Sequence, residues 1–266
     1  MTAGKALFVN SALAFASAQL IGAALHETGH GIAAQLLGFH PRIYAFFEDN
    51  PTGDARQTLT ILAAGPLASL LLGILFWLWY RASKPRYSFP RLLLLWLAVG
   101  GVMTFVNYLI VTPWLAGGDT AQFADVLGWP TIARYGISAV GVAIMISLAR
   151  PAARALFDVA PRAVDLGSTR ARRRFILRAF YLPLIAGAFL TTVGAIGGPP
   201  LILIYEFLAA FGTIDIVGAA MYAGVTPPRG DDRAPDAPLR IEPAAILLYV
   251  VLVLVYVFAF SRGVPI

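Results

Sequence analysis

Near the start of the chain, three residues of the types that bind metal ions and transfer protons lie within five positions of one another. The segment His26-Glu27-Thr28-Gly29-His30 has the form His-Glu-x-x-His. On a helix, imidazoles at positions i and i+4 lie on one face, where both can reach a single Zn²⁺ at about 2.0–2.1 Å. Glu27 lies about 100° around the helix from His26, so it can accept a proton from a water that the metal activates. The spacing is typical of zinc hydrolases and predicts Glu27 as the general base.

The composition indicates that this motif lies in a membrane. Hydrophobic residues make up 59 % of the chain and charged residues only 13 %, whereas a soluble domain has about 25 % charged residues. Such a chain cannot cover a water-facing surface, so lipid must solvate much of it. Ionisable residues are costly in lipid and are rarely kept there without a partner or an ion. Three of them in one apolar helix therefore favour a metal site over a chance match.

The search for a third metal ligand is short, because the chain has no cysteine and only three histidines. Any metal must then be held by His, Asp or Glu, and catalytic zinc keeps three protein ligands and one position for water. Asp119 is the predicted third ligand, since Gly117 and Gly118 before it permit the backbone to bend toward a partner. Asp125 is the substitute. His40 is interpreted as an interfacial loop residue.

Seven apolar segments are candidates for helices that cross the hydrocarbon core, which takes about 20 residues. We therefore expect an all-α, polytopic membrane helix bundle of about six to seven transmembrane helices, with no separate soluble domain. The sixth segment contains Glu206 and Asp215 and could instead be two half-helices. The segments are Leu7–Phe39, Gln57–Tyr80, Pro90–Thr112, Thr131–Leu148, Phe175–Ile196, Leu201–Ala223 and Ala244–Phe260.

The basic residues predict the orientation of these helices. If alternate connections lie on opposite sides, sixteen Lys and Arg residues share the side of the N-terminus, and only Arg42, Arg56, Arg134 and Arg262 lie on the other. Positive loops mark the cytoplasmic side, so we expect a multi-pass cell-membrane protein with its N-terminus in the cytoplasm. Basic loops beside a membrane report topology and contact with anionic lipid, so no nucleic-acid partner is expected.

A cleaved signal peptide is the rival interpretation of the N-terminal segment. Lys5, the apolar run after it and Ala16-Ser17-Ala18 imitate one. Two points oppose cleavage. The apolar run continues past the cleavage site, and cleavage would put the arginine-rich loop outside.

Two further segments accompany the His-Glu-x-x-His helix in the first half of the chain. Residues 64–70 read Ala-Gly-Pro-Leu-Ala-Ser-Leu, and Asn107 is followed by Pro113 and by Gly118-Asp119. Together the three segments resemble the site-2 protease family of intramembrane metalloproteases (peptidase family M50). Residues 24–34 are similar to the family's His-Glu-x-Gly-His helix, and residues 64–70 to its Ala-Gly-Pro-Leu-Ala-Asn-Leu signature. The third segment is loosely similar to Asn-x-x-Pro…Asp-Gly, from which it departs in spacing and in the order of Gly118 and Asp119.

The resemblance covers about residues 7–128 and implies a zinc metalloendopeptidase that cleaves membrane protein substrates within or beside a transmembrane segment. It implies one Zn²⁺ per chain, bound by His26, His30 and Asp119, with Glu27 as general base. It also implies a three-helix metalloprotease core in residues 1–128, followed by C-terminal transmembrane helices in residues 129–266. The candidate substrate-binding residues are Asn107, Gly65 and Pro66. Many family members open toward the cytosol, whereas the charge count places this site toward the outer face.

Several alternatives stay open. Residues 42–48 are aromatic and alternate weakly, so they could offer a strand edge that binds an unwound substrate through main-chain hydrogen bonds, or form an interfacial loop. Gly65-Pro66 can open space beside the zinc or only kink a helix. The protein could be a metal-binding scaffold without proteolytic activity, against which the intact Glu27 argues. It could also be a transporter that uses Glu206 and Asp215, whose flux would survive Glu27→Gln.

Overall fold

The computed structural model describes residues 3–44, 53–83, 88–161, 164–194, 212–227 and 240–266. Its described part contains six helical segments that are long and apolar enough to cross a membrane. They confirm the expectation of an all-α helix bundle of the multi-pass membrane type. The segments are α1 (Ala3–Leu36), α2 (Ala55–Ala82), α3 (Phe89–Val111), α5 (Thr131–Asp158), a continuous run of α6 (Thr169–Ile176), η1 (Leu177–Tyr181) and α7 (Leu182–Val193), and α9 (Pro243–Phe258).

Three of the expected helices differ clearly in extent from the structure. The fifth was expected to begin at Phe175, but its helical run begins at Thr169. The fourth was expected to end at Leu148, but α5 continues through Pro151 to Asp158. It continues because residues after the proline, such as Leu156 and Phe157, are buried in the core. Of the sixth expected segment, the structure describes a helix over residues 212–222, in which Asp215 is exposed. Residue 206 lies outside the described part of the chain.

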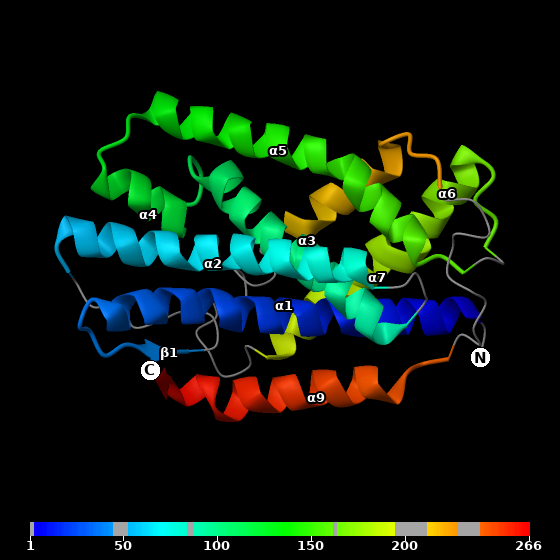
Figure 1. The fold of residues 1–266 in the computed structure, drawn as a ribbon, viewed down its shortest axis with the longest axis horizontal. Helices are drawn as coiled ribbons and strands as arrows, with labels where there is room; N and C mark the ends of the chain where they lie inside the picture. The colour runs from blue at the N-terminus through cyan, green and yellow to red at the C-terminus, as the bar shows by residue number, and fades with distance from the viewer. Residues whose placement is uncertain (1–2, 45–52, 84–87, 162–163, 195–211, 228–239) are drawn as a thin grey trace.

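Helix α1 is the central element of the bundle (Figure 1). It packs against α2, α3, α7 and α9. Helices α2 and α3 approach each other closely where Gly73 faces Gly101. A Cβ at residue 101 would lie only 2.7 Å from the Ser69 carbonyl oxygen. Small residues at such a crossing let the backbones of membrane helices pack together. Helices α1, α2 and α3, which carry the predicted site residues other than Asp119 and Asp125, therefore form one tightly packed unit.

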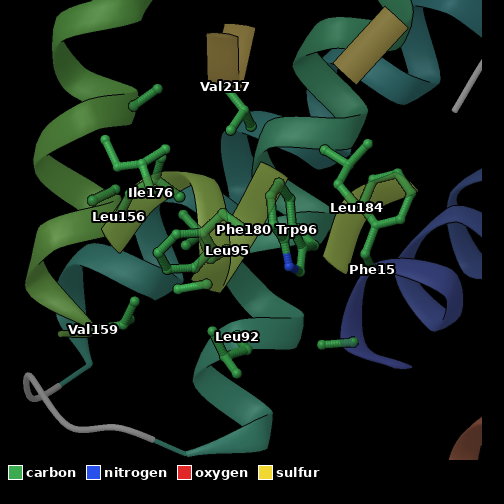
Figure 2. Packing of buried hydrophobic residues seen from close by; sticks show 14 of the residues in the cluster. Phe15, Leu92, Leu95, Trp96, Leu156, Val159, Ile176, Phe180, Leu184 and Val217 are labelled. Atoms are coloured by element: carbon green, nitrogen blue, oxygen red, sulfur yellow. The ribbon is translucent and has the colours of Figure 1, made fainter. Parts of the chain in front are cut away.

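The hydrophobic core joins this unit to the C-terminal helices. Phe15 of α1 meets the Trp96 ring of α3 edge-on at 5.3 Å, and Trp96 in turn lies 6.0 Å from the ring of Phe180. Figure 2 shows these rings among Leu92, Leu95 and Leu184. The Tyr80 hydroxyl donates to the carbonyl of Ala155, which ties the end of α2 to α5. The core is thus continuous across the boundary at residue 128.

Four short elements complete the end of the bundle where α1 ends and α2 begins. Helix α4 (Asp119–Val126) packs against α2 and α3. Strand β1 (Arg42–Ile43) pairs antiparallel with β2 (Val264–Pro265), which follows α9 through the short 3₁₀ helix η3 (Phe260–Arg262). The C-terminus consequently lies beside the end of α1, far from the N-terminus (Figure 1).

Candidate metal centre

The two histidines of the His-Glu-x-x-His motif lie on the face of α1 that packs against α2. His26 is 5 % exposed and His30 3 % exposed. Two glycines permit this packing. A Cβ at residue 29 would lie 2.7 Å from the Cβ of Ala68, and a Cβ at residue 65 would collide with the imidazole of His30. Gly29 and Gly65 therefore bring the helices close enough for the imidazoles to be enclosed between them.

Helix α2 also fixes the orientation of both rings. The Nδ1 of His30 donates to the backbone carbonyl of Ile61 at 2.7 Å, and the Nδ1 of His26 lies 3.0 Å from the Ser69 hydroxyl. A carbonyl can only accept, so in the neutral imidazole of His30 the proton sits on Nδ1 and the lone pair on Nε2. Hydrogen bonds of this kind hold metal-binding histidines in the correct tautomer.

The two Nε2 atoms and one carboxylate oxygen form a nearly equilateral triangle. The Nε2 atoms of His26 and His30 lie 3.1 Å apart, and Oδ2 of Asp119 lies 3.0 Å from the first and 3.3 Å from the second. Ligands at 2.0–2.1 Å from a tetrahedral ion lie about 3.3 Å apart. These residues thus form a group that could hold a metal ion, with the third ligand that was predicted from the sequence.

Asp119 reaches the triangle because α4 begins at this residue and is held against the end of α3. The Thr120 hydroxyl donates to the Tyr108 carbonyl at 2.6 Å, and it also contacts the Thr112 hydroxyl at 2.8 Å. Burial by itself would raise the pKa of Asp119, but hydrogen bonds that the Nε2 atoms of protonated His26 and His30 donate to its carboxylate hold this pKa well below the usual range. Asp119 is therefore ionised at neutral pH, which is the form that binds a cation.

Tyr108 of α3 closes one side of the group. Its ring stacks on the imidazole of His26, with centroids 5.4 Å apart and planes within 7°. Its hydroxyl oxygen lies 3.5 Å from Nε2 of the same histidine. Neither Tyr108 nor Ser69 was singled out from the sequence. The available signals were weak: Ser69 lies one helical turn after Gly65, and Tyr108 follows the predicted Asn107.

The other residues predicted from the sequence lie at different places relative to the candidate metal group. Glu27 is partly buried on α1, next to His26. Asp125 lies elsewhere and is exposed, in an ion pair with Arg134 at 2.6 Å. The amide of Asn107 packs against Gly212.

Gly65 and Pro66 both lie within α2, where Gly65 faces His30. Pro66 has no N–H to donate to the turn before it, and its ring crowds the carbonyl four residues earlier. A proline inside a helix bends it at this point. The adjacent carbonyl of Ile61 is the one that accepts the hydrogen bond of His30.

Two nitrogen donors and one carboxylate, with no thiolate, can bind a divalent ion of borderline hardness and leave a fourth position for water. The candidate ligands come from α1 and α4, and the groups that orient them come from α2 and α3. No protein-family model matches this chain, and no curated protein or solved structure matches it either.

Proposed function

We propose that this protein is an intramembrane zinc metalloendopeptidase that hydrolyses peptide bonds within or near transmembrane segments of membrane proteins. One observation carries the proposal: the 3.0–3.3 Å triangle of His26 Nε2, His30 Nε2 and Asp119 Oδ2, with a glutamate beside it in the sequence His-Glu-x-x-His. A purely structural metal site has no use for an acid–base residue at that position.

The donor set favours zinc among the common metal ions. Calcium and magnesium prefer six or more oxygen ligands, whereas zinc accepts two imidazoles, one carboxylate and a water. When bound, Zn²⁺ would supply Lewis-acid chemistry, polarising a water and the carbonyl of the peptide bond. His26, His30 and Asp119 would hold it.

Glu27 would transfer the protons. Its carboxylate would take a proton from the attacking water and deliver it to the nitrogen of the departing amine. The position of Glu27 supports this role, because it lies next to His26 in α1 and is partly buried there. The Tyr108 hydroxyl, which lies 3.5 Å from Nε2 of His26, would donate a hydrogen bond to the carbonyl oxygen as negative charge develops there.

The surroundings of the site support a substrate that comes from the bilayer. Large apolar side chains near the site on α1 and α2 are exposed, among them Ile32 (48 %), Leu36 (82 %), Leu67 (54 %) and Leu71 (60 %). In a membrane-spanning bundle such side chains face lipid. A peptide that reaches the metal group past these side chains would be apolar, as a transmembrane segment is.

Zinc analysis and cleavage assays on the same purified proteins test the proposal. We expect about one zinc per chain in the wild type, loss of most zinc in His26→Ala, and full zinc content without cleavage in Glu27→Gln. His40→Ala is the matched control, because His40 is exposed and outside the group; it should keep both metal and activity. Undiminished cleavage by Glu27→Gln would remove the general-base assignment.

A further inference from the structure

The C-terminal residues of the chain form a strand against β1. Arg42 lies opposite Pro265, and Ile43 lies opposite Val264. The backbone N–H of Ile266 donates to the carbonyl of Pro41 and extends the pairing by one residue. Strand β1 begins the segment 42–48 that the sequence marked as a possible docking edge for an unwound peptide. Residues 42–44 of that segment are described, and 45–48 lie outside the described part.

This pairing lies next to the candidate metal centre. A Cβ at residue 31 would lie 2.7 Å from the side chain of Ile266 and 3.1 Å from that of Ile43. Gly31 directly follows the metal-binding candidate His30, so the residue after β2 contacts α1 beside that histidine. The lack of a side chain at residue 31 leaves a small apolar socket, and Ile266 fills it.

Two features hold the C-terminal strand in position. The guanidinium of Arg42 donates to the carbonyl of Gly263 at 2.7 Å and to that of Arg262 at 3.3 Å. Gly263 has a φ of 73°, a backbone conformation that favours glycine, and it turns the chain from η3 into β2. The strand is nevertheless short, and a pair of two-residue strands is only marginally stable without further packing.

We propose that residues 264–266 act as an internal competitor that occupies the substrate-docking edge of β1 until an extended substrate peptide displaces them. This inference rests on the proposed function. An incoming strand would form the same main-chain hydrogen bonds with residues 41–43 and place an aliphatic side chain in the socket at Gly31. Because the competitor is part of the same chain, its effective concentration is high, in the millimolar range for short connections. Only peptides that unwind and fit the socket would replace it.

A reversible crosslink tests this competition, because the native chain has no cysteine. Arg42 and Pro265 lie opposite each other and are exposed. The hydrogen bond from Ile266 to Pro41 shows that residues 41 and 266 are a hydrogen-bonded pair of the ladder. Hydrogen-bonded and non-hydrogen-bonded pairs alternate along antiparallel strands, so Arg42 and Pro265 are a non-hydrogen-bonded pair, with Cα atoms about 4.5 Å apart. That spacing suits a disulfide. Arg42→Cys/Pro265→Cys should therefore crosslink on mild oxidation and reopen with a reductant.

Two readouts are compared between the oxidised and reduced states: cleavage of a membrane reporter substrate, and binding of a fluorescent peptide with the sequence of residues 260–266. In the oxidised, locked protein we expect both cleavage and peptide binding to fall by at least about tenfold, because the competing strand can no longer dissociate. Zinc content should stay unchanged. Reductant should restore both. The single variants Arg42→Cys and Pro265→Cys control for the loss of the guanidinium and of the proline. Ile266→Gly, which empties the socket, should bind the peptide more tightly than the wild type.

The outcomes separate this inference from the proposed function. Equal cleavage and equal peptide binding in the locked and reduced states would overturn the internal competitor and leave the protease assignment intact. Failure of the disulfide to form would overturn the pairing itself. A third outcome is that the zinc-loaded protein cleaves no substrate but still binds the peptide less well when the disulfide is formed. That result would support the docking edge and refute the protease function.

Discussion

The imidazole of His30 lies directly on the backbone of Gly65, in the space that any side chain at residue 65 would fill. This contact joins α1 to α2 at the candidate metal centre. Gly65 lies one helical turn before Ser69, whose hydroxyl contacts Nδ1 of His26. A residue of α2 that offers no ligand atom thus determines where His30, a candidate ligand on α1, can lie.

Gly65→Ala should weaken metal binding without removing a ligand. The added methyl group would displace Nε2 of His30 from the triangle, and we expect zinc affinity to fall about 10–100-fold or more, as it does when an outer partner of a ligand is lost. Competition with a chromogenic chelator measures the affinity. Gly22→Ala is the matched control, because a Cβ at residue 22 would meet open space. Equal affinities for the two variants would show that the contact has no effect on the ligand.

Ser69→Ala should loosen His26. The substitution removes the partner of Nδ1, so the ring loses the hydrogen bond that fixes its tautomer and orientation. We expect zinc affinity to fall about 10–100-fold and activity at limiting zinc to fall in parallel. Ser147→Ala on the exposed face of α5 should change neither. A Ser69→Ala protein with wild-type affinity would contradict the role of Ser69.

Tyr108→Phe should separate chemistry from metal binding. Phenylalanine keeps the ring that stacks on His26 but has no hydroxyl, so zinc content should stay at the wild-type level. Loss of one hydrogen-bond donor to a developing oxyanion costs about 10²–10³ in kcat. Steady-state cleavage of a reporter substrate measures kcat and KM separately. Tyr135→Phe, at an exposed tyrosine of α5, is the control, and an unchanged kcat in Tyr108→Phe would exclude this donor.

Asp119→Asn and Asp125→Asn form a pair that identifies the third ligand. A side-chain amide in place of the Asp119 carboxylate would be a neutral and weaker ligand between two imidazoles, so Asp119→Asn should lose most of its zinc. Asp125 pairs with Arg134 at an exposed position, and its substitution should leave zinc content unchanged. Metal analysis after dialysis against excess EDTA distinguishes them. The opposite order of zinc loss would transfer the third-ligand role to Asp125.

The sequence predicted the helices and the three members of the candidate metal group, and for the helices and the two histidines short-range information was enough. Runs of apolar residues indicate helices that cross a membrane, and the i, i+4 spacing places His26 and His30 on one face whatever surrounds them. Asp119 was identified because it follows two glycines at the expected end of the third helix, and because the family resemblance implies an aspartate there. In the structure it begins a separate short helix, α4, rather than ending the third.

The groups that orient the ligands could not be predicted, because they depend on how the helices pack. Every residue has a backbone carbonyl, so nothing in the sequence marks that of Ile61. It accepts from His30 only because of where α1 and α2 pack together. Ser69 and Tyr108 are common residue types in membrane helices. The pairing of β1 with β2 joins residues more than 200 positions apart, and two-residue strands leave no periodic pattern in a sequence.

The most direct test of the metal centre is the location of zinc by anomalous scattering in crystals of the zinc-loaded protein. We predict one anomalous peak at the zinc edge, within about 2.0–2.2 Å of Nε2 of His26, Nε2 of His30 and a carboxylate oxygen of Asp119. A fully occupied peak bound elsewhere, or no ordered peak between these three residues at saturating zinc, would contradict the proposed metal centre.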